Sequence, residues 1–184
     1  MAFFLVMESL SNEEMVQSKT VLEVIAVAAE FCRFIDKIDN QEQTEVFGFL
    51  QKILTALYLK GSLLSAIEVD DEEANERFVT EEEYETLRYQ LSRYFDSKDY
   101  FTAVDFVSGN TESMPVSLSE LLCDIYLDLK DFLILYSKES LAAKENAVAN
   151  CYYYFQTNWG LKLTMALPYI HYILSQQVVQ NDEY

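Results

Sequence analysis

Three aspartates spaced for one face of a helix are the first residues in this sequence that could do chemistry. Asp124, Asp128 and Asp131 are separated by four and three positions, which places their side chains on one helical face. Together they could hold a hard cation or act in acid–base catalysis. A metal would also need ligands from other segments, and neither an EF-hand loop nor another ligand pattern occurs. A solvent-facing acidic stripe explains the same spacing, so we expect no metal and no catalytic residue here.

Two lysines stand where the pattern around them predicts apolar residues. Lys60 interrupts a seam of leucines at helical spacing, and Lys130 lies among apolar residues, away from the acids of its own helix. A buried ammonium must reach water or find a carboxylate. These lysines could anchor a ligand or act in catalysis with a lowered pKa. We favour a structural role, with each lysine partly buried and paired with a carboxylate of another segment; Asp36, Glu30 and Asp128 are candidates.

His171 and Trp159 belong to an aromatic-rich C-terminal stretch. His171 is the one histidine, and a proline three positions before it rules out the E-x-x-H motif of di-iron bundles. It could be a lone general base, but a packed, hydrogen-bonded histidine is the more common case. Trp159, with the tyrosines on both sides of it, could line a pocket or a partner-binding face. Burial in the core is the simpler explanation for most of these rings.

Glycine and cysteine usage excludes several common sites. The four glycines stand far apart, so no phosphate-binding loop of the Walker or Rossmann type can be formed. Cys32, Cys123 and Cys151 lie in apolar surroundings without C-x-x-C spacing, which excludes the usual zinc and redox motifs. We therefore expect no cofactor, and buried free thiols in a cytoplasmic protein.

The charge balance limits the partners. There are 31 acidic residues against 13 lysines and arginines, a formal net charge of −18. Phosphate backbones and anionic lipid head groups repel such a chain, so we expect no nucleic-acid and no membrane partner. A basic protein is the partner that this charge favours. The densest run, residues 68–85, holds ten acids and only Arg77 as a base. A solvated surface is nevertheless the ordinary reason for such charge.

The elements that must position these residues are helices. Half of the 184 residues are hydrophobic, while there are only four glycines and two prolines, too few for the turns of a sandwich or barrel. We predict an all-α bundle of five or six helices, with one domain over residues 11–177. Residues 1–10 are predicted to be a loosely ordered extension without the features of a signal peptide, and residues 178–184 a frayed tail.

Helical periodicity and capping residues give the predicted helices. The ranges are 13–38, 44–66, 81–95, 118–137 and 141–177, the third and fourth opened by capping boxes at Thr80 and Ser117. A straight helix over the last range would be longer than the domain, so we predict a break at residues 158–160 and a kink at Pro168. Residues 96–115 have no clear pattern, apart from a turn signal at residues 108–110.

Several short segments together resemble a bacterial family of unknown function. They are found at residues 28–34, 57–64, 78–83, 124–132 and 159–171. On these segments the chain resembles domain of unknown function family 5063, of the gut Bacteroides group. The resemblance implies a bacterial helical bundle and covers about residues 20–175, but it brings no activity and no catalytic residue. Pro168 departs from it, because a charged helix former is expected there.

Two functions of different kinds remain. The first is a non-enzymatic interaction or regulatory module that uses an acidic or aromatic surface, for example as a mimic of nucleic-acid charge. The alternative is an enzyme or small-ligand binder built around Lys60, Lys130 and the three aspartates. Convergence of these side chains on one pocket would favour the alternative, and their dispersal would favour the first.

Overall fold

The computed structural model describes residues 11–104 and 113–182, and this part of the chain is mostly helical, as predicted. The helices are α1 (Asn12–Val16), α2 (Lys19–Ile35), α3 (Gln43–Gly61), α4 (Glu81–Phe95), α5 (Leu118–Tyr136), α6 (Leu141–Thr157) and α7 (Trp159–Asp182). Short 3-10 turns lie at η1 (Ile38–Asn40), η2 (Glu72–Ala74) and η3 (Asp96–Lys98). Strands β1 (Tyr100–Val104) and β2 (Ser113–Ser117) pair antiparallel, with Thr102 opposite Pro115.

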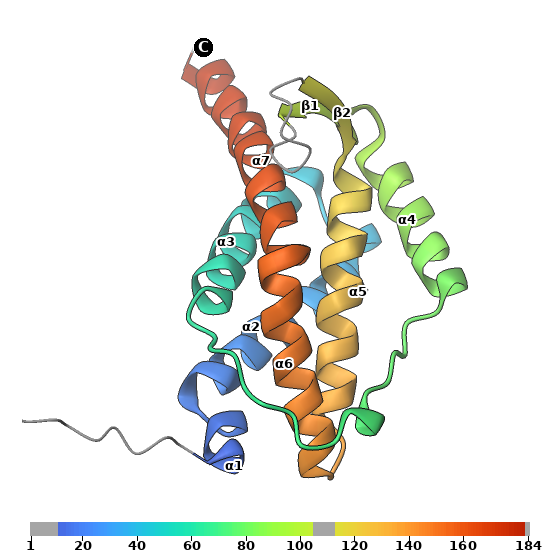
Figure 1. The fold of residues 1–184 in the computed structure, drawn as a ribbon. Helices are drawn as coiled ribbons and strands as arrows, with labels where there is room; N and C mark the ends of the chain where they lie inside the picture. The colour runs from blue at the N-terminus through green and yellow to red at the C-terminus, as the bar shows by residue number, and fades with distance from the viewer. Residues whose placement is uncertain (1–10, 105–112, 183–184) are drawn as a thin grey trace, which may run out of the picture.

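Helix α5 is the centre of the bundle. It packs against α2, α4, α6 and α7, and most of its residues are buried (Figure 1). The core contains buried side chains from every helix, because each presents an apolar face inward. No helix in the described ranges has the length and apolar character needed to cross a membrane.

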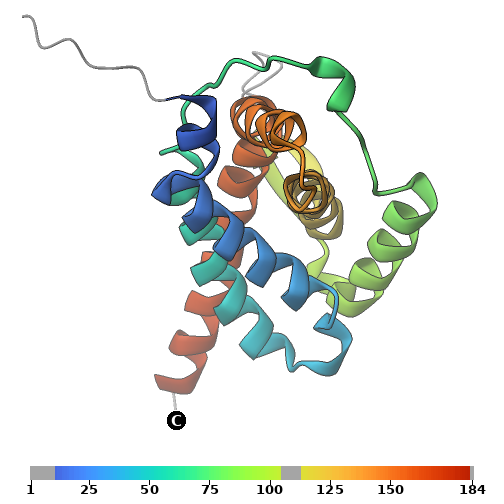
Figure 2. The same cartoon turned by 90° about the horizontal axis from the view of Figure 1, so that it is seen from below.

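Helix α4 stands on the far side of α5 from α3, and residues 62–80 make the connection (Figure 2). We call residues 62–80 the strap, because they run across the ends of α6 and α5 (Figure 1). Polar side chains hold it down: Asn146 of α6 donates a 2.7 Å hydrogen bond to the carbonyl of Asp71, and Asn150 donates a 2.8 Å bond to Asn75. The strap thus carries six of the ten acids of the run 68–85 over one end of the bundle, and the other four lie on α4.

The helix predicted over residues 13–38 is two helices. A break falls between Val16 and Lys19, where the Ser18 hydroxyl caps the first turn of α2. Ser11 and Glu14 form a capping box that starts α1. Periodicity alone does not reveal this break, because the apolar spacing continues across it. The next helix is also shorter than predicted and ends at Gly61 instead of residue 66.

The two predicted capping boxes differ. At Thr80 both halves form, and α4 spans the predicted residues. At Ser117 the hydroxyl accepts from the amide of Glu120, but the Glu120 carboxylate lies 3.9 Å from Arg88 instead of returning to the cap. Buried Asp99 takes part in its place, accepting a 2.8 Å bond from the Ser119 amide. The start of α5 is therefore capped from a distant segment.

The region without a clear pattern contains the small sheet, so the fold has no more than two short strands in its described part. The turn signal at residues 108–110 lies outside the described residues, as does the extension 1–10. The predicted break near residue 158 is confirmed: α6 ends at Thr157 and α7 begins at Trp159. Helix α7 then continues through Pro168 to Asp182, so helix extends into the predicted tail.

Candidate functional site

The seven residues singled out from the sequence do not converge on one pocket. Asp128 and Asp131, predicted on a solvent-facing stripe, are 5% and 7% exposed, so that expectation was wrong. Asp131 accepts hydrogen bonds from the amides of Phe78 and Val79 at 2.8 and 2.9 Å, and both aspartates pair with Arg77. Their role is to fasten the strap to α5.

Asp128 is the more strongly desolvated of the two. Burial raises its pKa, against the hydrogen bond from Asn158 and the charge of Arg77. The Asn158 amide lies 2.6 Å from its carboxylate, which ties α5 to the junction between α6 and α7. Arg77 also lies over the ring of Tyr154, 4.6 Å from the centroid. These contacts join three elements around one carboxylate, and the hollow beside it has a volume of only about 10 Å³.

Asp124, the third aspartate, lies in a different network. It accepts a hydrogen bond from the Tyr84 hydroxyl at 2.9 Å and one from the ammonium of Lys162. These contacts connect α5 with α4 and α7. Burial and the nearby carboxylate raise the pKa of Tyr84, so its phenol keeps its proton and donates. This network also has a structural explanation.

Both lysines are partly buried and paired with another segment, as predicted. Lys130 pairs with Asp36 at 3.4 Å, which was one of the candidate partners. Lys60 pairs with Glu23 at 2.8 Å, which was not. The side chains in these pairs are 27–42% exposed, so both are partly exposed ion pairs near the surface.

Trp159 and His171 lie apart from these networks and from each other. Trp159 is fully buried and donates a 3.2 Å hydrogen bond to the carbonyl of Cys151. His171 is exposed, and its Nδ1 lies 2.8 Å from the side-chain amide of Gln51 on α3. The histidine is hydrogen-bonded as expected, but it is not packed in the core, and among the described residues no carboxylate contacts it.

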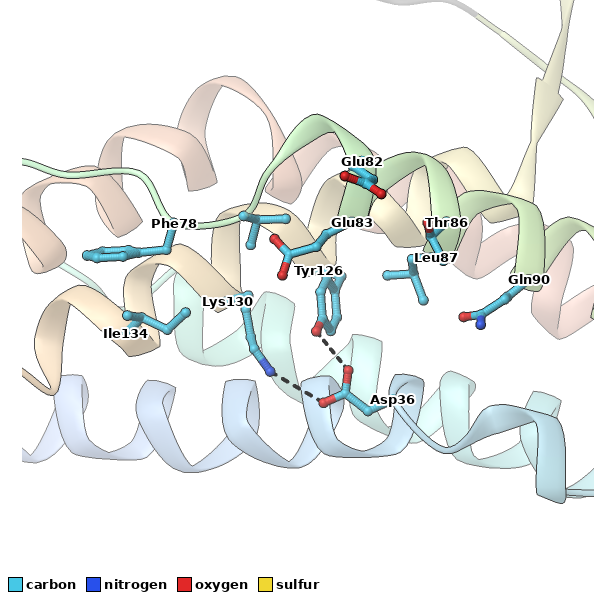
Figure 3. Close-up of a pocket in the computed structure, with 11 residues that line it drawn as sticks. Asp36, Phe78, Glu82, Glu83, Thr86, Leu87, Gln90, Tyr126, Lys130 and Ile134 are labelled. Atoms are coloured by element: carbon cyan, nitrogen blue, oxygen red, sulfur yellow. Dashed lines mark hydrogen bonds and ion pairs between the residues drawn. The ribbon is translucent and has the colours of Figure 1, made fainter.

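Of the seven residues, Lys130 lies in an open groove. The groove has a volume of about 390 Å³ and runs between α2, α4 and α5 (Figure 3). Its walls combine apolar side chains with carboxylates, one ammonium and several hydroxyl and amide groups. The lining residues are Asp36, Phe78, Val79, Glu82, Glu83, Thr86, Leu87, Gln90, Tyr126, Lys130 and Ile134.

Asp36 forms the α2 side of this groove. It follows the last residue of α2, at the negative end of that helix, where a carboxylate is disfavoured unless a donor compensates. Two donors do so: the Tyr126 hydroxyl at 2.7 Å and the Lys130 ammonium at 3.4 Å (Figure 3). Burial is the main cause that raises the pKa of Tyr126, and the hydrogen bond to Asp36 is the second. The phenol therefore keeps its proton and remains a donor.

The first turn of α4 forms the opposite side. Glu83 belongs to the capping box, and hydrogen bonds from the amide and hydroxyl of Thr80 lower its pKa. Within the described ranges, Glu82 makes no hydrogen bond or ion pair, and it is exposed. With Asp36 the groove therefore has three carboxylates and one ammonium, a formal charge of −2.

Sequence reasoning did not identify this groove as a site. Asp36 was considered only as a partner for a lysine. Tyr126 was assigned to the core side of its helix, and Glu82 was assigned to the acidic run. Apolar periodicity places Tyr126 with the core, and nothing local reports that its hydroxyl reaches Asp36, 90 positions away. Aspartate directly after a helix is the one local signal, because it needs a compensating donor.

The ten acids of residues 68–85 are all exposed. They follow the strap and the first turns of α4, and Arg77 within this run has its guanidinium bound to Asp128 and Asp131. This segment, which we call the acidic segment, borders the groove, since Phe78, Val79, Glu82 and Glu83 belong to both.

The described residues contain no cluster of three or more side chains suited to a metal ion. Cys32, Cys123 and Cys151 are free and buried. Burial raises the pKa of Cys32 and Cys123 to about 12, so these thiols stay protonated at neutral pH. A second hollow of about 490 Å³ lies between β1 and α7, and the described residues that line it include no charged one.

Comparison with known proteins identifies the family but no activity. No curated protein matches the chain. The crystal structure of protein BF1032 from Bacteroides fragilis, a structural genomics target, is similar, with a TM-score of 0.77 and 32% identity over 86% of this chain and 94% of that one. A family model described as domain of unknown function (DUF5063) matches residues 15–176. The chain therefore belongs to the DUF5063 family of domains of unknown function.

Proposed function

We propose that this protein is a non-enzymatic interaction module that binds a basic protein partner through the acidic segment. The observation that carries the proposal is the exposure of all ten acids of this segment while its one arginine is bound to Asp128 and Asp131. The one internal counter-charge, the partly exposed guanidinium of Arg77, is thus already paired with two buried carboxylates of α5. A negative surface that faces a positive surface of the partner accelerates association and favours basic partners over others.

The dispersal of the chemistry-bearing residues supports this proposal over an enzyme. Lys60, Lys130 and Asp124 lie in three separate contacts, and Asp128 with Asp131 fastens the strap. A catalytic site needs such groups within reach of one reacting atom. We propose neither a nucleic-acid nor a membrane partner. The compartment that we propose for the protein is the cytoplasm, where free thiols persist.

The strap also has a feature that suits recognition. Its backbone is held by hydrogen bonds to Asn146 and Asp131, so the acids are presented on an ordered segment. An ordered segment loses less conformational entropy on binding than a disordered acidic tail does. This property is also what a mimic of nucleic-acid charge would need.

The test removes four charges from the strap without touching its anchors. The strap variant carries Asp70→Asn, Glu72→Gln, Glu73→Gln and Glu76→Gln. A short synthetic peptide rich in arginine and lysine is titrated by calorimetry at physiological salt. We expect about tenfold weaker binding than in the unaltered protein, because the four acids would contact the bound peptide directly. Salt screens such contacts far less than it screens charges beyond the Debye length of roughly 8 Å.

A matched control changes the net charge equally but elsewhere. It carries Glu13→Gln, Asp39→Asn, Glu42→Gln and Glu45→Gln, all exposed positions. Both variants have a formal net charge of −14, which is four units less negative than −18. We expect the control to lose less than about threefold in affinity. Equal losses in the two variants would contradict the proposal, because the peptide would then respond to net charge alone.

A further inference from the structure

The groove between α2, α4 and α5 lies beside the acidic segment and has its own chemistry. Helix dipoles do not decide its charge, because the negative end of α2 at Asp36 and the positive end of α4 at Glu82 carry opposite partial charges of about half a unit each. The side chains decide it instead. Among the lining residues three carboxylates stand against one ammonium, so the groove stays negative even with the Lys138 ammonium beside Phe78.

The apolar part of the lining suits an aliphatic stem. Phe78, Leu87 and Ile134 are half-buried and face the groove with the carboxylates around them (Figure 3). Long cationic side chains combine a stem of this kind with a charged end. The volume of about 390 Å³ is at the lower end of the range for small-ligand sites.

Aromatic rings at the groove already attract cations. The Lys130 ammonium lies 5.4 Å from the ring centroid of Tyr126, and the Lys138 ammonium lies 5.1 Å from that of Phe78. The Lys130 ammonium also pairs with Asp36, so it acts as a resident cation in part of the groove. Glu82 and Gln90 of α4 carry oxygen acceptors that Lys130 does not use, because its ammonium is directed to Asp36.

From these observations we infer that the groove binds a cationic side chain, an arginine or lysine, of the basic partner. The inference rests on the proposed function and names the site where one residue of that partner is recognised. The guanidinium or ammonium contacts Asp36, and its stem lies against Leu87. Glu82, on the other side of the first turn of α4, adds to the negative potential without contacting Asp36 (Figure 3). Lys130 is then a competitor for Asp36, not an anchor for an anionic ligand.

The test uses capped single amino acids and two glutamates in the first turns of their helices, one in the groove lining and one on α3. N-acetylarginine amide is titrated into the isotope-labelled protein, and binding is followed by the amide NMR shifts of groove residues. Glu82→Gln should weaken binding about threefold, since one partly solvated charge is lost. Glu45→Gln, an exposed acid in the first turn of α3 and outside both the lining and the acidic segment, should leave the affinity unchanged.

Lys130→Met gives the opposite sign. It removes the resident cation and should strengthen arginine binding about threefold, while the neutral analogue N-acetylcitrulline amide should bind no variant well. Binding of N-acetylglutamate that is lost in Lys130→Met would overturn the inference, because Lys130 would then be an anion anchor. Equal affinities of Glu82→Gln and Glu45→Gln would overturn it as well.

Two further experiments complete the test. The first distinguishes an arginine of a protein from a free cationic metabolite, and the second distinguishes failure of the groove inference from failure of the proposed function. A basic peptide with a central arginine should bind more tightly than agmatine; equal binding would indicate a free metabolite and contradict the inference. If the strap variant weakens peptide binding while Glu82→Gln does not, the groove inference fails and the proposed function stands. If only Glu82→Gln weakens binding, the acids of the strap do not contact the partner, the proposed function fails for the strap, and the groove remains.

Discussion

Asp131 fastens the strap to α5 through three hydrogen bonds. Its carboxylate accepts hydrogen bonds from the amides of Phe78 and Val79 and from the guanidinium of Arg77, and its side chain is 9% exposed. Buried acceptors of this kind are costly to remove, because each stranded amide loses its partner without regaining water. The cost at this residue is therefore set by the amides more than by the ion pair.

Asp131→Ala should destabilise the protein by roughly 2–4 kcal/mol, because two amides and Arg77 lose their acceptor. Asp131→Asn keeps an oxygen for the amides and should cost about 1 kcal/mol. Urea unfolding measures both. Asp39→Ala, at an exposed position, is the control and should stay within about 0.5 kcal/mol of the unaltered protein. A similar small loss in Asp131→Ala would show that the strap is not held from α5.

Helix α3 contains two glycines in contrasting surroundings. A Cβ at Gly61 would lie 2.5 Å from Cη2 of Trp159 and 2.6 Å from Cδ2 of Phe155, whereas a Cβ at Gly48 would meet nothing within 4 Å. Gly61 thus allows the end of α3 to approach the junction of α6 and α7. Gly48 costs the helix conformational entropy without such a benefit.

Gly61→Ala should therefore destabilise the protein by about 1–3 kcal/mol, through overpacking against Trp159. Gly48→Ala should stabilise it by up to about 1 kcal/mol, because alanine is the better helix former. Thermal or urea unfolding of the two variants makes a matched comparison within one helix. If both substitutions changed stability in the same direction, the close packing at Gly61 would not limit the fold.

For the molecule as a whole, the charge balance predicts what it does not bind. With a formal net charge of −18 and no basic surface run in the sequence, duplex DNA should not bind measurably at physiological salt. Fluorescence anisotropy with labelled random-sequence DNA tests this. The basic peptide used above is the positive control on the same protein sample. Submicromolar DNA binding would contradict both this prediction and the acidic-surface proposal.

Local interactions were enough to predict much of the fold. The capping box at Thr80 and the start of α4 depend on residues three positions apart, so they can be read from the sequence. The apolar periodicity of residues 118–136 likewise marked α5 as a central helix. Such features need only near neighbours along the chain, and the surplus of acids needs only composition.

The tertiary structure alone decided which charges are buried and what they meet. Asp128 and Asp131 have the spacing of a solvated stripe, yet the strap covers them, because Arg77 and two strap amides fit over α5. Asp36 meets Tyr126 and Lys130 across about half the chain. Partners that distant are set by how helices pack, and a carboxylate looks the same in sequence whether it faces water, a strap or a groove.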